Sequence, residues 1–313
     1  IRTVPEEVPM RVFVTGATGH IGSAVAAAFA RAGHETCGLV RDPQKTASLE
    51  AAEVVPVLGT MEEPDAWREV AGRCSVLVHC AVDSSDRSWD LHRAALGALR
   101  DAARDRVDRV LLATSGVWVY GDTGEAAVDE STPLDPPTFS APRPAVDAAV
   151  LSWNGAGLRT LVIRPGCVYG GAGSLTADWF ESASRDGAAR VVGDGTNRWA
   201  MVHRDDLADL YVRAAESGLS GEVLNATDRS RSTVLECAIA ASRAAGAEGR
   251  VEHLPVEQAV AAMGPFATGL ALNQHVASWK AVRRLGWTPR HAGFVDEAPR
   301  LFAAWRASRT EAA

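Results

Sequence analysis

Long apolar stretches and an excess of positive charge are both missing from this chain of 313 residues. No run approaches the ~20 apolar residues that a membrane-spanning helix needs, and the start lacks the charged-then-apolar pattern of a secretory signal. The 32 Lys and Arg residues are outnumbered by 39 Asp and Glu, which gives a net charge of -7. We therefore expect no nucleic-acid or membrane partner, and a small-molecule substrate instead.

Cysteine and histidine never occur at metal-ligand spacings. The sequence has no C-x-x-C and no H-x-x-x-H, although it contains five cysteines and eight histidines. Several of the cysteines stand in apolar, strand-like runs; the five are Cys37, Cys74, Cys80, Cys167 and Cys237. We expect free thiols, a reducing cytoplasmic location and no metal site.

Short β-rich runs alternate with helical stretches through the first half of the chain. Helices such as 21–32 and 89–104 stand between strands that are predicted at 11–15, 35–40, 53–58, 75–81, 109–115 and 159–165. Apolar strands separated by helices are typical of a parallel sheet covered on both faces. The expected fold class is α/β, a doubly wound parallel sheet of the Rossmann type with a smaller C-terminal substrate-binding region.

The rhythm of strands and helices changes after Pro165. We predict that residues 10–165 form a dinucleotide-binding core and that 166–313 form a substrate-binding lid, which returns strands and helices to the core. Met10 directly precedes the first strand pattern, so we interpret residues 1–9 as a tag or a disordered extension.

A glycine-rich turn links the first strand to the first helix. The segment "VFVTGATGHIGSAV" places Gly16, Gly19 and Gly22 between them. A glycine triplet alone is weak evidence, but this one follows a strand, opens a helix and precedes a second strand. That context favours a pyrophosphate bound at the helix N-terminus over a merely tight turn.

With its G-x-x-G-x-x-G turn, the chain resembles the extended branch of the short-chain dehydrogenase/reductase superfamily, which includes epimerases, dehydratases and reductases. Further stretches resemble landmarks of that family: "VHCA" (78–81), "TSGVWVYG" (114–121), "RPGCVYGGAG" (164–173), "GDGTNRWAMVHRDDLAD" (193–209) and "LGWTP" (285–289). The resemblance implies a dinucleotide cofactor. It assigns cofactor binding to Gly16, Thr18, Gly19, His20, Ile21, Gly22, Arg41, Cys80, Ala81 and Pro165.

The end of the second strand indicates which dinucleotide binds. NAD-specific members of the family carry an acidic residue there, whereas this chain has Val40 followed by Arg41. A guanidinium group matches a 2′-phosphate that a carboxylate would repel. The sequence therefore favours NADP over NAD, unless Arg41 is only a solvated loop residue.

The usual catalytic pair of the family is absent. The resemblance implies a tyrosine acid/base, a lysine four residues later and a Ser or Thr that orients the carbonyl; those places hold Phe139, Arg143 and Gly116. Only three tyrosines and two lysines occur, and none forms Y-x-x-x-K. Pro144 favours a helix that starts near it, so Phe139 and Arg143 would not share one helical turn.

Five residues are candidates for the missing chemistry: Asp83, Ser115, Arg143, Tyr169 and His203. Arg143 can bind a ribose or an oxyanion but is a poor proton donor. His203 is a candidate proton carrier, as are the other polar groups near the strand ends. Three of the five have a plainer interpretation: helix capping for Asp83, packing under the lid for Tyr169 and a structural role for His203.

Three classes of function remain open. The first is an atypical NADP-dependent oxidoreductase acting on a small hydrophobic or aromatic carbonyl or hydroxyl compound. The second is a non-redox lyase, isomerase or cyclase on the same scaffold, and the third is a dinucleotide-bound sensor or interaction protein. Trp199 replaces an arginine that nucleotide-sugar members often carry, which disfavours such a substrate. The resemblance also implies a homodimer, formed by the helices that follow the fourth and fifth strands.

Overall fold

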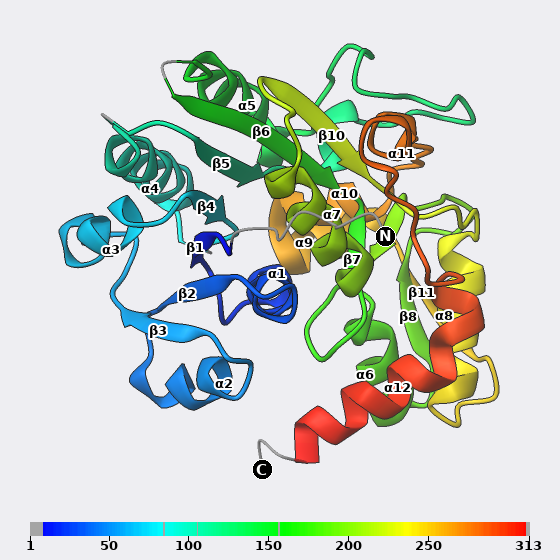
Figure 1. Cartoon of the computed structure of the whole chain (residues 1–313). Coiled ribbons are helices and arrows are strands. Elements are labelled where there is room, and N and C mark those ends of the chain that lie inside the picture. Colours follow the sequence, from blue (N-terminus) through cyan, green and yellow to red (C-terminus); the bar gives the residue numbers. More distant parts are fainter. Residues whose placement is uncertain (1–8, 84, 105, 156, 311–313) are drawn as a thin grey trace, which may run out of the picture. The chain divides into compact units, whose positions relative to one another are not determined.

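The computed structural model describes residues 9–83, 85–104, 106–155 and 157–310 (Figure 1). The interpretation of residues 1–9 as an extension falls, apart from Pro9, outside the described residues. Among the helices that are described, none is both long and apolar enough to cross a membrane.

A seven-stranded sheet, in the order β10-β6-β5-β4-β1-β2-β3, is the central element of the fold. Its strands are β1 (Arg11–Thr15), β2 (Glu35–Val40), β3 (Val55–Leu58), β4 (Val76–His79), β5 (Arg109–Thr114), β6 (Leu158–Pro165) and β10 (Glu222–Ala226). The pairs β1–β2, β1–β4, β2–β3 and β4–β5 are parallel. The predicted doubly wound α/β fold is confirmed.

Contacts divide the chain into two compact units, and the first consists of residues up to 113 together with 150–161 and 214–222. The helices of this unit are α1 (His20–Arg31), α2 (Thr46–Glu50), α3 (Arg68–Gly72) and α4 (Ser88–Ala102), with 3-10 turns at Pro43–Lys45 and Pro64–Ala66. In its core, Phe13 of β1 is fully buried and stacks on Trp67 with ring centroids 5.5 Å apart. All four residues of β4 are buried, as a parallel strand covered on both faces requires.

The second unit consists of residues 114–149, 162–213 and 223–313. Its helices include α5 (Arg143–Ser152), α6 (Ala177–Asp186), α7 (Arg204–Glu216), α8 (Val234–Ala244), α9 (Val256–Met263), α10 (Ala267–Leu270), α11 (Trp279–Leu285) and α12 (Phe294–Thr310). Its short 3-10 helices are Val117–Tyr120, Thr138–Ser140 and Gly264–Phe266. Trp179 stacks on Trp199 with centroids 5.1 Å apart, and Phe294 packs against Trp179 and Phe180. Burial of these large rings supplies much of this unit's apolar stabilisation.

Two small parallel pairs of strands belong to the second unit. They are β7 (Cys167–Tyr169) with β9 (Met201–His203), and β8 (Ala189–Val192) with β11 (Val251–Leu254). Only β10 of the later strands joins the large sheet. β10 therefore lies at the edge of the large sheet, while the other four strands pair among themselves.

The division between the units differs from the boundary predicted after Pro165. The chain leaves the first unit after residue 113 and returns to it at 150–161 and again at 214–222. Each unit is therefore discontinuous in sequence. A change in the rhythm of helices and strands could not reveal this, because it depends on contacts between distant segments.

Candidate active site

The turn between β1 and α1 brings two stretches of backbone together in the first unit. Gly16 has a φ of +71°, and a Cβ there would lie 2.7 Å from the Ala81 backbone. At Gly22 a Cβ would lie 2.1 Å from the Gly16 carbonyl oxygen. The Gly19 N–H donates to the same oxygen at 2.9 Å, immediately before α1 begins. A side chain is therefore excluded at Gly16 and at Gly22, and the close backbone approach suits a phosphate-binding loop at a helix N-terminus.

The other predicted cofactor residues of the first unit border this turn. Thr18, His20 and Ile21 are partly exposed, and His20 is the first residue of α1. Cys80 follows β4, and its N–H donates to the Thr15 carbonyl at 3.2 Å. The structure therefore places Thr18, His20 and Ile21 on this loop and the first turn of α1, with Cys80 bonded to the loop from the end of β4.

Arg41 is the first exposed side chain after β2, since Val40 is buried. The pKa of Asp83 is lowered, first by hydrogen bonds from the Ser85 hydroxyl and N–H and then by the charges of Arg41 and Arg87. The Ser85 N–H donates to Asp83 Oδ1 at 2.8 Å. Asp83 thus closes a local turn close to Arg41, and its predicted contact with substrate stays a prediction.

A buried row of hydrogen bonds at the end of β4 was not anticipated from the sequence. Thr15 Oγ1 and His79 Nδ1 lie 2.8 Å apart, and His79 Nε2 lies 2.8 Å from His92 Nδ1. His92 stands on α4, thirteen residues after His79. No short motif marks such a pair, because strand, loop and helix separate its members.

In the second unit, the place of the family's tyrosine belongs to an aromatic cluster. The ring of Phe139 lies 5.2 Å from that of Trp118 and 5.6 Å from that of Phe266, and Trp118 and Phe266 are 5.4 Å apart. Gly269 of α10 lies against the end of the Phe139 ring, since a Cβ there would be 2.8 Å from Cζ. We define Trp118, Phe139 and Phe266 as the aromatic triad.

Arg143 is the first residue of α5, whereas Phe139 lies in the preceding 3-10 turn. The helix starts one residue earlier than Pro144, and the two side chains do not share a helical turn. Arg143 Nη1 donates to the Thr114 carbonyl at 3.2 Å, at the carboxyl end of β5. Burial lowers the pKa of this guanidinium, and the negative charge of Asp147 opposes that shift. It remains charged at neutral pH.

Ser115 belongs to a buried polar network. Its hydroxyl donates to Asp147 Oδ2 at 2.8 Å, and Arg164 Nε and Nη2 donate to the same oxygen at 3.1 and 3.0 Å. Arg164 also donates to Tyr120 Oη, which donates to Asn225 Oδ1 at 2.9 Å. Burial raises the pKa of Asp147, and the charge of Arg164 opposes this. The hydroxyl hydrogen of Ser115 is thus directed at Asp147, so a ligand could use only its lone pairs. Pro165, predicted to contact the cofactor, is buried at the end of β6.

Tyr169 and His203 lie together in a buried cluster on β7 and β9. Their rings are 5.2 Å apart, and Tyr169 is fully buried. Burial, together with the negative charge of Asp228, raises the pKa of the Tyr169 phenol. Burial and the neighbouring His291 lower the pKa of His203 to about 4. Both groups are therefore uncharged at neutral pH, and their predicted catalytic roles stay predictions.

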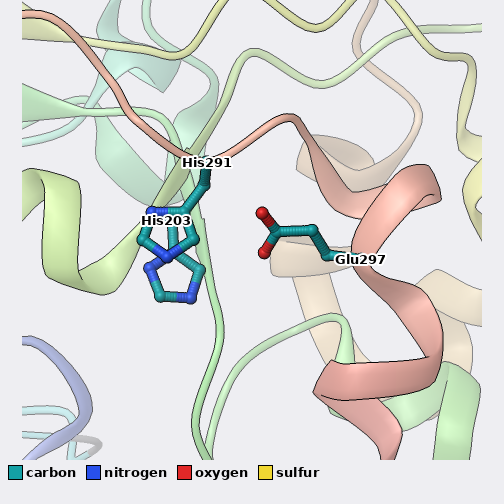
Figure 2. A group of neighbouring side chains, drawn as sticks. All are labelled: His203, His291 and Glu297. Atoms are coloured by element: carbon teal, nitrogen blue, oxygen red, sulfur yellow. The ribbon is translucent and has the colours of Figure 1, made fainter.

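His203, His291 and Glu297 are the one group of three potential metal ligands found among the described residues, with ligand atoms within 4.8 Å of one another (Figure 2). The two imidazoles are stacked, with centroids 3.4 Å apart and planes at 16°. Each Nδ1 has a partner, the Asp205 N–H for His203 and the Asp206 carboxylate for His291. A metal ion binds in the plane of each imidazole ring. Parallel rings this close cannot both point at one ion without rotating, so the arrangement is that of a structural cluster.

A cavity of about 410 Å³ lies in the same unit, between the segments around Trp199, Asp228 and Trp279. Arg198, Arg229 and Arg231 line it, but none of the five predicted catalytic residues does. The cavity therefore adds nothing to the assignment of catalytic groups.

Comparison with known proteins shows the family of this chain. A model of the NAD dependent epimerase/dehydratase family matches residues 12–227. The chain is 31% identical over 299 residues to the protein C2A9.02 of Schizosaccharomyces pombe, covering 92% of this chain and 98% of that protein. It is 29% identical over 265 residues to the Stigmatella aurantiaca 4-hydroxy-2-methyl-3-oxo-4-farnesyl-3,4-dihydroquinoline-1-oxide ketoreductase, covering 81% and 78%. Further curated relatives carry the names of reductases for different small molecules.

Among solved structures, the chain is similar to the human epimerase family protein SDR39U1 with NADPH. The TM-score is 0.77, the identity 23%, and the likeness covers 94% of this chain and 99% of the human protein. At this identity the likeness supports the fold.

Proposed function

The chain belongs to the NAD-dependent epimerase/dehydratase family, and from that premise we propose that it is an NADP-dependent reductase of a small hydrophobic or aromatic carbonyl compound. Its curated relatives include a ketoreductase and reductases of other small molecules. The choice of carbonyl reduction over a non-redox reaction depends on the groups that surround the carboxyl end of β5.

The residues of the first unit fit a dinucleotide. Gly16 and Gly22 allow the backbone of the turn to pack closely, and the turn leads to the start of α1, where a pyrophosphate can bind. Arg41 is exposed directly after β2 and has the charge to pair with a 2′-phosphate. A bound NADPH would supply a hydride to the carbonyl carbon.

The position of Arg143 is the observation that carries the proposal. It stands in the lysine place, and its hydrogen bond to the Thr114 carbonyl holds it at the carboxyl end of β5. Ligands of doubly wound sheets bind at that end of the strands. We assign Arg143 the task of stabilising the oxygen that becomes negative as the carbonyl is reduced. Water then gives the proton, so that ketone, NADPH and one proton yield alcohol and NADP⁺.

Substitution of Arg143 tests this assignment. Arg143→Gln should lower kcat by ~10²-fold in NADPH-dependent ketone reduction, because a positioned charge at the oxyanion is lost. The kcat of Arg143→Lys should lie between those of wild type and Arg143→Gln, since lysine keeps the positive charge but lacks the planar guanidinium group. The measurements are NADPH consumption with a panel of aryl ketones and calorimetric affinity for NADPH.

Arg93→Gln is the matched control, because Arg93 lies on the surface of α4 in an ion pair with Asp90. It should leave kcat unchanged. An Arg143→Gln enzyme that loses NADPH affinity but keeps kcat would show that Arg143 serves the cofactor alone. If the wild type binds NADPH but reduces no carbonyl, the non-redox alternative takes precedence.

A further inference from the structure

Neither the backbone conformation nor the packing at Gly116 requires a glycine. Its φ is -177° and its ψ 152°, an extended conformation that any residue adopts. A Cβ at this position would meet nothing nearer than the Pro165 carbonyl oxygen, at 4.0 Å. Gly16, in contrast, has both a positive φ and backbone within 2.7 Å of a Cβ. Neither conformation nor crowding therefore explains the missing side chain at 116.

Local energetics also favour another residue at this position. Gly116 is the N-cap of the 3-10 helix Val117–Tyr120, and no side chain caps that helix. Ser and Thr are favoured at helix N-caps because their hydroxyl accepts a free backbone N–H. Glycine also loses more conformational freedom on folding than alanine or serine. The chain thus carries glycine where a small side chain would make the folded state more stable.

The surroundings of Gly116 indicate what the free space accommodates. Along residues 114–118 the exposed and buried positions alternate: Thr114, Gly116 and Trp118 are partly exposed, while Ser115 and Val117 are buried. Two residues before Gly116, the Thr114 carbonyl accepts a hydrogen bond from the Arg143 guanidinium. Two residues after it, Trp118 in the 3-10 helix Val117–Tyr120 belongs to the aromatic triad. The extended backbone of Gly116 therefore stands in the chain between the residue that holds the cation and a residue of the triad.

We infer that Gly116 forms the floor of a slot for a planar aromatic ring, whose carbonyl oxygen reaches Arg143 and whose far edge packs on the aromatic triad. A π system packs closely on bare backbone and makes edge-to-face contacts with Trp118 and Phe266, whereas a saturated ring is thicker. The inference rests on the proposed function for the role of the carbonyl group. It names the class of substrate as aryl ketones and related planar carbonyl compounds.

The test compares stability with ligand affinity in Gly116→Ala and Gly116→Ser. The Tm of the ligand-free protein should rise by roughly 1–4 °C in both variants, because neither strain nor a clash opposes the new side chain. The affinity for 1-tetralone, an aryl ketone, should fall by ~10-fold or more in calorimetric titrations with NADP⁺ present. Wild type should also bind 1-tetralone more tightly than the saturated ketone 1-decalone.

Gly97→Ala is the matched control, since a Cβ on Gly97 of α4 would also meet no atom within 4 Å. It should raise the Tm and leave 1-tetralone affinity unchanged. Because binding is measured without turnover, a failure of the proposed reaction does not decide this test. The inference is overturned if both Gly116 variants bind 1-tetralone as wild type does, if they lose NADP⁺ affinity instead, or if wild type shows no preference for the planar ketone.

Discussion

The ring of Phe139 packs between Gly269 of α10 and the rings of Trp118 and Phe266. The Cζ atom, where tyrosine would carry its hydroxyl, is the ring atom nearest to Gly269. The rings of Trp118 and Phe266 pack around the same side chain. A hydroxyl group on Cζ would add a polar atom on the side of the ring that faces Gly269 of α10. Phe139 therefore fills this place as an apolar ring packed on Trp118 and Phe266.

Restoring the family's catalytic pair should consequently fail. We predict that Phe139→Tyr/Arg143→Lys gains less than ~10-fold in NADPH-dependent reduction of simple ketones, although a working acid/base pair is worth ~10²–10⁴-fold. The 3-10 turn at Thr138–Ser140 keeps position 139 off the helix that starts at Arg143. The single variant Phe139→Tyr separates disturbed packing from altered chemistry. A gain of ~10²-fold in the double variant would mean that the site is an ordinary reductase site that has merely lost its pair.

Single residues were predictable from the sequence where a motif fixes their place, and not where distant segments meet. The helix start predicted near Pro144 lies at Arg143, one residue earlier, and Phe139 lies in the 3-10 turn before it. The contact of Phe139 with Phe266 and Gly269 joins segments more than 120 residues apart, and no spacing rule gives it. The hydrogen bond between Ser115 and Asp147 likewise joins residues that are 32 positions apart, and no motif predicts it.

Among the elements, the junction of β9 with α7 contains a pair of stacked histidines, of which the buried His203 is uncharged at neutral pH. His203 ends β9, and its Nδ1 accepts the Asp205 N–H at 3.2 Å in the first turn of α7. His291 stacks on His203 and pairs with Asp206, so the same junction is tied to the segment before α12. A proton on His203 would therefore place a positive charge inside a buried cluster, directly against the His291 ring.

This junction should make the protein sensitive to acid. The pKa of His203 is lowered from 6.5 to about 4, mainly by burial and then by His291. Because the unfolded chain binds this proton more readily, stability is unaffected above pH 6.5, falls as the pH decreases from 6.5 toward 4, and then levels off. We expect the loss to be on the order of 2–3 kcal/mol. Denaturant unfolding of wild type and His203→Asn at pH 7 and pH 4.5 measures it.

His203→Asn keeps an acceptor for the Asp205 N–H but cannot titrate. Its stability should therefore depend less on pH than that of wild type. The exposed His253 on β11 offers a control, since His253→Asn should leave the pH dependence as it is. Parallel curves for wild type and the His203→Asn protein would contradict the assignment.

The sequence predicted the strands of the large sheet and the longer helices better than the short helices and the small strand pairs. β1 and β2 begin and end at the predicted residues, and α1 and α4 are displaced by one or two. These segments carry continuous apolar runs or several helical turns, so their patterns are strong. The five-residue helices α2 and α3 and the pairing of β8 with β11 were not predicted. A helix of one turn is too short to show a period, and the pattern within a strand does not name its partner.

For the whole molecule, cofactor binding should be visible as added stability. A ligand that binds only the folded protein at 100 times its Kd adds about 2.7 kcal/mol, or several degrees in Tm. We predict a larger rise with NADPH than with NADH at equal concentration, because Arg41 can form a charge-assisted contact with the 2′-phosphate. That contact corresponds to an affinity ratio of roughly 10–100.

Arg41→Ala should bring the two Tm shifts close together, and thermal melts with calorimetry can check this. Arg31→Ala, an exposed arginine in the last turn of α1, serves as the control and should keep the difference. Asp83 lies close enough to Arg41 for their charges to interact, so Asp83→Asn should widen the preference for NADPH. Equal shifts with both dinucleotides in the wild type would refute the predicted NADP preference.

The repeated crossing of the chain between its two units limits how such a protein can be altered. A gene fragment that stops before residue 222 encodes only part of the first unit, and one that starts after residue 114 lacks most of it. Neither unit can be expressed, exchanged or fused to another protein as one uninterrupted segment. Exchange of chain ends at a point between residues 114 and 222 would break both units at once. Substitutions made in place, at positions such as 116, 139 and 266, leave the division of the chain intact.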